Sequence, residues 1–190
     1  MPSVTDKEKL RRALKEVLIS EGERREADNR IRERFFSEDV EKHKKVFVYV
    51  AVGDEVETEG IIKHYLELPA EVYVPLCHGK GEMEAKRIFS MSDLVPGRYN
   101  IPEPPEDAVA CDPRELSLIV VPGLAFGEDL SRLGRGAGYY DRFLKKAENA
   151  EKVALCREAN IFKTVPHESH DVFVDMIVTE KRIIKEKRGR

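Results

Sequence analysis

The chain has 190 residues, the size of one ordinary domain, and its 41% of hydrophobic residues suffice for a core, which excludes a disordered chain. Charged residues reach 36% but almost balance, with 33 Lys and Arg against 36 Asp and Glu, and this excludes a general nucleic-acid binder with its basic excess. No apolar run is long enough for a membrane span, the first residues lack the apolar core of a signal peptide, and the three cysteines lack CxxC spacing, which argues against a disulfide framework or a cysteine zinc site.

Two amphipathic helices are predicted first, over about 5–18 and 27–35, because apolar residues recur there at helical spacing. The run 46–52 is unbroken β-branched and aromatic sequence, which predicts a strand buried on both faces. A helical stripe follows over 58–68. The segment 71–76 then predicts a strand that its proline ends.

The second half of the chain continues the alternation. Residues 79–90 predict a ribbon or an edge strand, and the proline-rich segment 96–105 predicts an ordered, turn-laden connection and not a helix. A second apolar strand follows over 116–121, and a glycine-bearing loop runs from it to about Gly138. The last predicted elements are a helix over 139–147, strands over 153–156 and 172–178, and a basic tail over 181–190 that we expect to be frayed.

The alternation of buried strands with helices indicates an α/β fold, a three-layer sandwich with a largely parallel sheet flanked by helices. There is no internal repeat and no convincing domain boundary. We therefore expect one domain over residues 1–190. We expect it to be cytoplasmic, a monomer or a weak homodimer, with neither nucleic acid nor a membrane as partner.

The loop after the strand 116–121 carries the strongest chemical signal. In open α/β sheets a ligand binds beyond the carboxyl ends of the strands, and this loop lies there. Alternate glycines at Gly134, Gly136 and Gly138 allow a ligand close to the backbone N–H groups, and the next helix directs its positive end at the same place. Nearby guanidinium groups, those of Arg132 and Arg135, suit phosphate oxygens.

General motifs leave the loop open to a second interpretation. It matches neither GxxxxGK[ST] nor GxGxxG, so neither a P-loop nor a dinucleotide fingerprint is present. Judged by its glycines alone, the segment is equally typical of a flexible turn with exposed arginines. Asp141, one turn into the helix, is a candidate ligand for a magnesium ion that bridges phosphates.

The longer string is more specific. VPGLAF at 121–126 followed by RLGRGAGYYDRFL at 132–144 resembles the signature of the 5-formyltetrahydrofolate cyclo-ligases, also called 5,10-methenyltetrahydrofolate synthetases. The resemblance extends over nearly the full chain. Four further segments are similar to family motifs: KEKLR at 7–11, GDEVET at 53–58, GRYNIPEP at 97–104 and VPHESHD at 165–171.

The resemblance implies the fold of the NagB/RpiA/CoA transferase-like group and an ATP- and Mg²⁺-dependent ring closure. The implied partners are 5-formyltetrahydrofolate and ATP. The implied products are 5,10-methenyltetrahydrofolate, ADP and phosphate. Phosphorylation of the formyl oxygen would prepare the carbon for attack by N10 of the folate.

The resemblance also implies a role for each matching residue. Catalysis is assigned to Arg135, Tyr140 and Asp141. ATP binding is assigned to Lys7, Arg11, Arg132, Leu133, Gly134, Arg135, Gly136, Ala137, Gly138, Tyr139 and Tyr140. Substrate binding is assigned to Val50, Glu55, Tyr99, Arg135 and Tyr139, and Mg²⁺ binding to Asp141 and Asp171.

Several of these side chains also fit plainer roles. Lys7 and Arg11 are typical of solvated helix charges, and Glu55 of a carboxylate that stabilises a helix N-terminus. The two tyrosines suit core packing. His167 and His170 suggest zinc, but no third ligand can be placed, so structural or solvent-facing roles are favoured.

Two alternative functions stay open. One is a different ATP-dependent phosphotransferase that uses the same glycine loop. The other is a catalytically silent folate- or nucleotide-binding protein, because Ala137 and Asn160 depart from residues common in the family.

Overall fold

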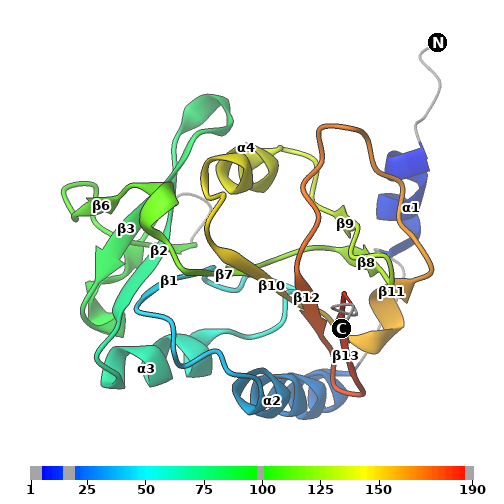
Figure 1. The fold of residues 1–190 in the computed structure, drawn as a ribbon, viewed down its shortest axis with the longest axis horizontal. Coiled ribbons are helices and arrows are strands. Elements are labelled where there is room, and N and C mark those ends of the chain that lie inside the picture. Colours follow the sequence, from blue (N-terminus) through cyan, green and yellow to red (C-terminus); the bar gives the residue numbers. More distant parts are fainter. Residues whose placement is uncertain (1–5, 15–19, 98–100, 187–190) are drawn as a thin grey trace.

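An eight-stranded sheet forms the centre of the computed structural model, which describes residues 6–14, 20–97 and 101–186 (Figure 1). Its strands are β1 (Lys45–Val48), β2 (Glu71–Cys77), β3 (Met83–Ile88), β6 (Ala110–Cys111), β7 (Leu118–Val121), β10 (Glu151–Leu155), β12 (Met176–Val178) and β13 (Ile183–Lys185). They lie in the order β13-β12-β10-β7-β1-β2-β3-β6. The five central strands, from β12 to β2, are parallel, and the outer strands on both sides are antiparallel to their neighbours. The predicted largely parallel sheet is confirmed.

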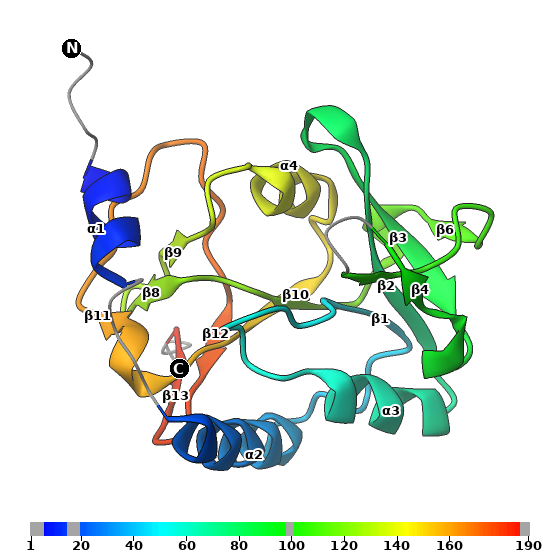
Figure 2. The ribbon, with the colours of Figure 1, turned by 180° about the vertical axis from the view of Figure 1, so that it is seen from behind.

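Helices cover both faces of this sheet (Figures 1 and 2). On one face lie α2 (Glu21–Ser37) and α3 (Glu59–Glu67), and on the other lies α4 (Tyr139–Lys146). The predicted three-layer arrangement is therefore confirmed. None of the helices in the described ranges is long and apolar enough to cross a membrane.

The first helix stands apart from these layers. It is α1 (Asp6–Leu14), and it lies beside a small sheet of β8 (Ala125–Gly127), β9 (Arg132–Leu133) and β11 (Ile161–Phe162) (Figure 2). Leu10 and Leu14 pack there on Leu133 and its buried neighbours. The remaining elements are β4 (Val95–Pro96), β5 (Pro102–Glu103) and short 3-10 turns at Gly79–Gly81, Met91–Asp93, Pro113–Glu115 and Glu158–Asn160.

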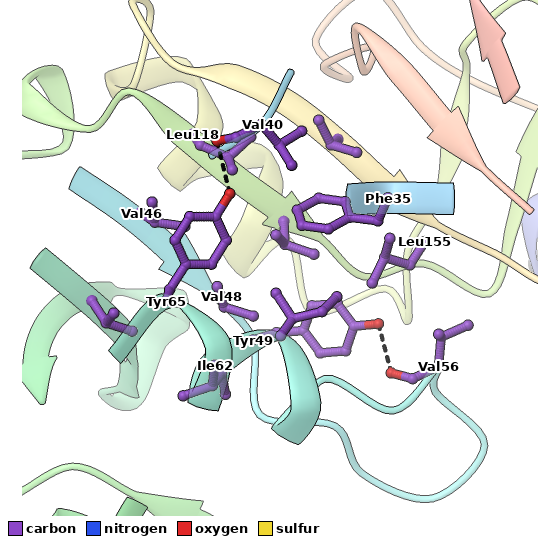
Figure 3. Packing of buried hydrophobic residues seen from close by; sticks show 14 of the residues in the cluster. Phe35, Val40, Val46, Val48, Tyr49, Val56, Ile62, Tyr65, Leu118 and Leu155 are labelled. Carbon is purple, nitrogen blue, oxygen red and sulfur yellow. Dashed lines mark hydrogen bonds between the residues drawn. The ribbon is translucent and has the colours of Figure 1, made fainter. Parts of the chain in front are cut away.

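The core consists of two apolar layers, one on each face of the sheet. Successive side chains of a strand point to opposite faces, so Val46 and Val48 of β1 join the layer under α2 and α3, while Phe47 joins the layer under α4. In the first layer the buried hydroxyl of Tyr65 donates to Val40 O at 2.8 Å (Figure 3). In the second, Phe47 stacks on Phe143 with ring centroids 4.7 Å apart. The apolar run 46–52 was therefore correctly predicted to be buried on two faces where it forms β1.

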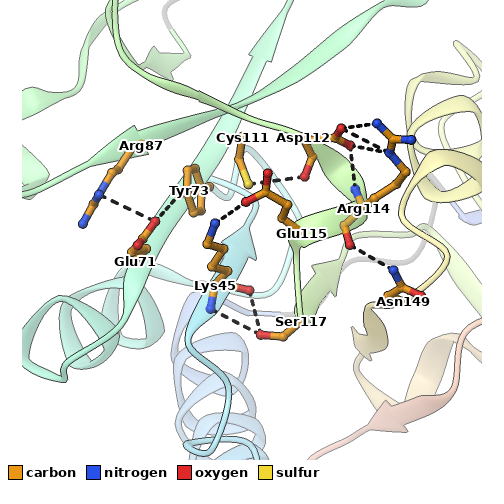
Figure 4. Close-up of polar contacts among 10 residues, drawn as sticks. All are labelled: Lys45, Glu71, Tyr73, Arg87, Cys111, Asp112, Arg114, Glu115, Ser117 and Asn149. Atoms are coloured by element: carbon orange, nitrogen blue, oxygen red, sulfur yellow. Dashed lines mark hydrogen bonds and ion pairs between the residues drawn. The ribbon is translucent and has the colours of Figure 1, made fainter.

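A polar cluster lies at the amino ends of the parallel strands, on the edge away from the glycine loop (Figure 4). Ser117 Oγ donates to Lys45 O at 3.0 Å and accepts from Lys45 N at 3.3 Å, which ties β1 to the chain just before β7. The Lys45 ammonium pairs with Glu115. These contacts join strand ends to one another, so we assign this cluster a structural role in holding the strands of the sheet together.

Strand lengths differ from the predictions where side chains replace strand pairing. The run 46–52 leaves the sheet after Val48, because the Thr58 hydroxyl donates a hydrogen bond to Tyr49 O at 2.6 Å and so replaces a strand partner there. Pro75 does not end β2. It lies beyond the last residue that pairs with β1, where the missing N–H is tolerated because the strand has a single neighbour.

Three predictions in the second half need correction. The glycine-bearing loop contains a hairpin of β8 and β9, with Leu130 at φ 70° in its turn. The strand predicted over 172–178 begins only at Met176, because Val174 N donates to Leu130 O instead of to a strand. The basic ending is not frayed over 183–185, which form β13 because Ile183 and Ile184 pack on the core; residues 187–190 lie outside the described ranges.

Candidate active site

The strand order places a crevice between the carboxyl ends of β1 and β7. Within the sheet, β2 lies next to β1 on one side, and the later strands β7, β10 and β12 follow in order on the other side of β1. The loops that follow β1 and β7 therefore diverge, and such a reversal of strand order is where open α/β sheets bind ligands. Glu55 is in the first of these loops, and the glycine loop is in the second.

A cavity of about 550 Å³ lies at this crevice. Its lining includes most of the residues assigned to the site from the sequence: Lys7, Arg11, Glu55, Arg132, Leu133, Gly134, Arg135, Gly136, Ala137, Gly138, Tyr139, Tyr140, Asp141 and Asp171. Val50 does not line the cavity and instead packs against the core layer of α2 and α3. Tyr99 lies outside the described residues.

Glu55 and Arg135 bring the two loops into contact. Glu55 Oε1 accepts from Arg135 Nε at 3.0 Å, and its other oxygen accepts from Val52 N at 3.0 Å. Arg135 also donates to Val52 O at 3.4 Å. The Glu55 side chain is 11% exposed and that of Arg135 is 52% exposed, so a nearly buried carboxylate is covered by a half-exposed guanidinium group.

Arg132 and Asp141 form the more buried ion pair of the cavity. Arg132 Nη2 lies 2.6 Å from Asp141 Oδ1, and the other Arg132 terminal nitrogen donates to Pro122 O at 3.2 Å. The Arg132 side chain is only 4% exposed. Its Nε is buried and has no hydrogen-bond partner among the described residues. A buried cation with a spare donor is suited to an anionic ligand.

The two tyrosines at the start of α4 differ in their hydrogen bonds. The Tyr139 hydroxyl donates to His78 O at 2.9 Å, across from β2. The Tyr140 hydroxyl is buried without a partner in the part of the chain that the structure describes. Burial, and after it the charge of Glu55, raises the pKa of Tyr140 well above its usual value. Its hydroxyl therefore stays protonated and retains an unused hydrogen-bond donor.

The glycines are required at two positions of the loop. Gly138 has φ 71° and ψ 10° and is the N-cap of α4, a left-handed conformation that glycine adopts without strain. Gly136 has φ 102°, and a Cβ there would lie 3.2 Å from Arg11 Cζ. The loop backbone is thus shaped by glycine, and at Gly136 the missing side chain leaves room for the guanidinium group of Arg11. Exposed loop N–H groups of this kind suit a phosphate group.

Two cationic side chains attach α1 to the cavity. Arg11 Nε donates to Gly134 O at 2.9 Å, and Lys7 Nζ lies 2.6 Å from Asp171 Oδ2 and 3.1 Å from Glu168 Oε1. Partial burial tends to lower the pKa of Lys7 and to raise the pKa of Asp171. The contacts between the ammonium and the carboxylates outweigh this effect, so the pKa of Lys7 is raised and that of Asp171 is lowered relative to their usual values. Lys7 and Arg11 are therefore directed inward at the site, and neither is a plain solvated helix charge.

The carboxylates that could hold a metal ion are each paired with a cation in the free protein. Asp141 contacts Arg132, and Asp171 contacts Lys7. Within the described ranges no three His, Cys, Asp or Glu side chains gather as a metal site. Two carboxylates on one cavity still fit Mg²⁺, which binds through one or two carboxylates together with substrate phosphates and water.

The comparisons with known proteins identify the family. Residues 3–180 match the model of the 5-formyltetrahydrofolate cyclo-ligase family. The chain belongs to this family. It is 34% identical over 149 residues to the 5-formyltetrahydrofolate cyclo-ligase of Mus musculus, which covers 72% of this chain and 73% of the relative. It is 32% identical over 146 residues to the probable 5-formyltetrahydrofolate cyclo-ligase of Schizosaccharomyces pombe, covering 69% and 72% of the two chains.

A solved structure extends the likeness to the whole fold. The NMR structure of Aquifex aeolicus 5,10-methenyltetrahydrofolate synthetase superposes with a TM-score of 0.87 at 32% identity, covering 98% of this chain and 95% of that one. Family membership confirms the enzyme class expected from the sequence, a 5-formyltetrahydrofolate cyclo-ligase.

Some residues that line this cavity were not assigned to the site from the sequence. Cys77, Ile101, Pro122 and Gly123 line it as well. Cys77 stands at the carboxyl end of β2, and this position at a strand end is the signal that could have found it. Burial raises the pKa of the Cys77 thiol, and His78 Nε2 contacts Glu84 at 2.8 Å, so these two residues are not arranged as a nucleophile and its base.

A larger hollow of about 960 Å³ lies elsewhere on the cyclo-ligase, at the amino ends of β10 and β12. Its lining is rich in carboxylates, among them Glu38, Asp39 and Glu151. It contains no residue of the glycine loop. The glycine loop and its arginines therefore belong to the smaller cavity.

Proposed function

We propose that this chain closes the ring of 5-formyltetrahydrofolate to give 5,10-methenyltetrahydrofolate, with conversion of ATP to ADP and phosphate. Family membership supports the reaction. The observation that carries the proposal is the composition of one cavity. It joins Glu55, which suits the N–H edge of a pterin, to a glycine loop with two arginines, which suits a triphosphate.

The chemical difficulty of the reaction is the formamide. Amide resonance, reflected in a rotational barrier of roughly 18–20 kcal/mol, makes the formyl carbon a poor electrophile and its oxygen a poor leaving group. Transfer of the ATP γ-phosphoryl group to that oxygen forms an O–P bond and releases ADP. The folate N10 then attacks the iminium-like carbon and loses its proton. Departure of phosphate leaves the methenyl bridge.

Positioning and charge neutralisation are the main tasks of a protein in such phosphoryl transfer. We assign them to Arg132 and Arg135 and to the backbone N–H groups from Gly134 to Gly138. Arg132 contributes a buried charge with a spare Nε donor, and the glycine loop lies at the positive end of α4. Lys7 and Arg11 close the same side from α1. Ala137 contributes only its backbone.

Tyr140 completes the set as a hydrogen-bond donor. Its buried hydroxyl has no partner within the described segments, which is unfavourable unless a ligand supplies an acceptor. The formyl oxygen and the transferred phosphoryl group both offer one. Tyr139 packs beside it, with its hydroxyl already engaged by His78.

Asp141 and Asp171 are the residues that would hold Mg²⁺ beside the phosphates. The ion would neutralise phosphate charge when bound. Each carboxylate now pairs with a cation of the site, so Arg132 and Lys7 hold the two carboxylates in place at the cavity until nucleotide arrives.

The test is turnover by the purified protein with 5-formyltetrahydrofolate and Mg-ATP. We expect the absorbance band of the methenyl product to grow with release of one ADP and one phosphate per product. ATP consumption without that band would favour a different phosphotransferase. Unchanged ATP together with folate binding would favour a silent binding protein.

A further inference from the structure

Outside the cavity, Arg157 holds the backbone of the loop that carries Glu55. Arg157 follows the carboxyl end of β10, and its Nη1 donates to Asp54 O at 2.8 Å. Its Nη2 lies 3.4 Å from Glu55 O. The side chain is 8% exposed and does not line the cavity. A buried guanidinium group therefore binds the peptide carbonyls on both sides of the Glu55 N–Cα–C unit.

Asp28 of α2 completes this arrangement. Its carboxylate accepts two hydrogen bonds from Arg157, from Nε at 2.9 Å and from Nη2 at 2.8 Å. Asp28 Oδ2 also accepts from Glu57 N at 3.2 Å. The Asp28 side chain is 12% exposed. The pair thus contacts the loop at residues 54, 55 and 57, on both sides of the Glu55 side chain.

We propose that the Arg157–Asp28 pair is a positioning device that fixes Glu55 for recognition of the folate. The proposal rests on the proposed role of Glu55. The loop leaves the sheet after Val48 and has no strand neighbour at Glu55 among the described residues. Glu55 N donates to Val52 O at 3.3 Å in a turn, and the carbonyls of Asp54 and Glu55 take their hydrogen bonds from the Arg157 side chain. The contacts of the Glu55 carboxylate itself, with Val52 N and Arg135, orient the side chain only if the backbone is fixed.

The geometry requires arginine at position 157. One planar fork serves the Asp28 carboxylate and two carbonyls at once, from Nε, Nη1 and Nη2. The ammonium of a lysine is a point charge and cannot span these acceptors. Arg157→Lys therefore keeps the charge beside Asp28 and releases the loop, which separates positioning from simple ion pairing.

The experiment compares Arg157→Lys with Glu158→Gln as a matched control. Glu158 lies in the adjoining 3-10 turn and pairs with Arg182 and Thr179, away from the Glu55 loop. We expect Arg157→Lys to raise the KM for 5-formyltetrahydrofolate about tenfold or more, with the KM for ATP changed less than about twofold. Glu158→Gln should change neither constant.

Amide hydrogen exchange and a double variant test the positioning role independently of the single-variant kinetics. Amide hydrogen exchange at Val52, whose N–H is held by the Glu55 carboxylate, should accelerate in Arg157→Lys and not in the control. In a Glu55→Gln background, Arg157→Lys should add less than about twofold to the folate KM, because the two changes act through one group. Unchanged Val52 exchange with an unchanged folate KM, or equal rises in both KM values, would overturn the proposal.

The positioning role of Arg157 can also be tested if the wild-type protein proves to have no cyclo-ligase activity. If the wild-type protein forms no methenyl product, calorimetric binding of 5-formyltetrahydrofolate replaces the KM as the measurement. A weaker folate affinity in Arg157→Lys alone would then support the positioning role without turnover. Equal affinities of wild type, variant and control would overturn it.

Discussion

Arg135 Nε lies 3.0 Å from Glu55 Oε1, across 80 positions of sequence. The contact joins the glycine loop after β7 to the loop after β1, so the two sides to which we assign nucleotide and folate touch in the free protein. On the proposed assignment, a pterin that displaces Arg135 from Glu55 releases the half-exposed guanidinium group toward the phosphates. We therefore expect binding of the two substrates to be linked through this ion pair.

Glu55→Gln should weaken folate binding selectively. The amide keeps the shape of the side chain but loses the charge that a pterin N–H edge and Arg135 both recognise. We expect the KM for 5-formyltetrahydrofolate to rise about tenfold or more, which corresponds to about 1.4 kcal/mol. Glu57→Gln, an exposed neighbour, is the control. A selective rise in the KM for ATP would contradict the assignment.

Arg135→Ala and Asp141→Ala should both lower turnover about 100-fold or more, as loss of a charge contact made in the transition state does. Their stabilities should differ. The half-exposed Arg135 contributes little to the free energy of unfolding. Loss of Asp141 leaves the buried Arg132 without its carboxylate partner, which lowers the free energy of unfolding by about 3–5 kcal/mol for a buried pair. Initial rates and urea unfolding measure the two effects. Near-normal turnover in both variants would show that the glycine loop does not bind the reacting phosphates.

Tyr140→Phe should separate stability from activity. The hydroxyl has no partner among the described residues, so its removal relieves a desolvation cost and should raise the free energy of unfolding by about 1 kcal/mol. Turnover should fall, because the donor to the ligand is lost. Tyr65→Phe is the opposite control: it removes the buried bond to Val40 O and should lower stability by about 1 kcal/mol without slowing turnover. A Tyr140→Phe variant with full activity would exclude the hydroxyl from the reaction.

Glu158→Gln should destabilise the protein in a pH-dependent way. Burial opposes the shift, but the Thr179 hydroxyl and Arg182 lower the pKa of Glu158 below its usual value. A group with a depressed pKa in the folded state stabilises fully above its unfolded pKa, about 4.3, and the contribution disappears as the pH falls through the folded value. The difference in unfolding free energy between wild type and variant should therefore be constant from about pH 6 to 8 and shrink below about pH 4. A difference that grew on acidification would contradict the direction of the shift.

The sequence determined the layers of the fold and indicated the glycine loop as the proposed nucleotide side of the site. Apolar periodicity located β1, α3, β7 and α4, because burial on one or two faces leaves a pattern that a single segment carries. The string from Arg132 to Asp141 was recognisable for the same reason, since its glycines, arginines and tyrosines are contiguous.

Only the tertiary structure decided which distant side chains meet. The Arg135–Glu55 contact, the spare donors of Arg132 and Tyr140, and the hold of Arg157 on the Glu55 loop depend on strand order, which brings the ends of β1, β7 and β10 together. Likewise, the structure places the half-buried Val50 against the core layer of α2 and α3 and not on the cavity lining, because its direction depends on where β1 ends. A sequence records what each segment buries; hydrogen bonds between segments are fixed only when the sheet sets their separation and orientation.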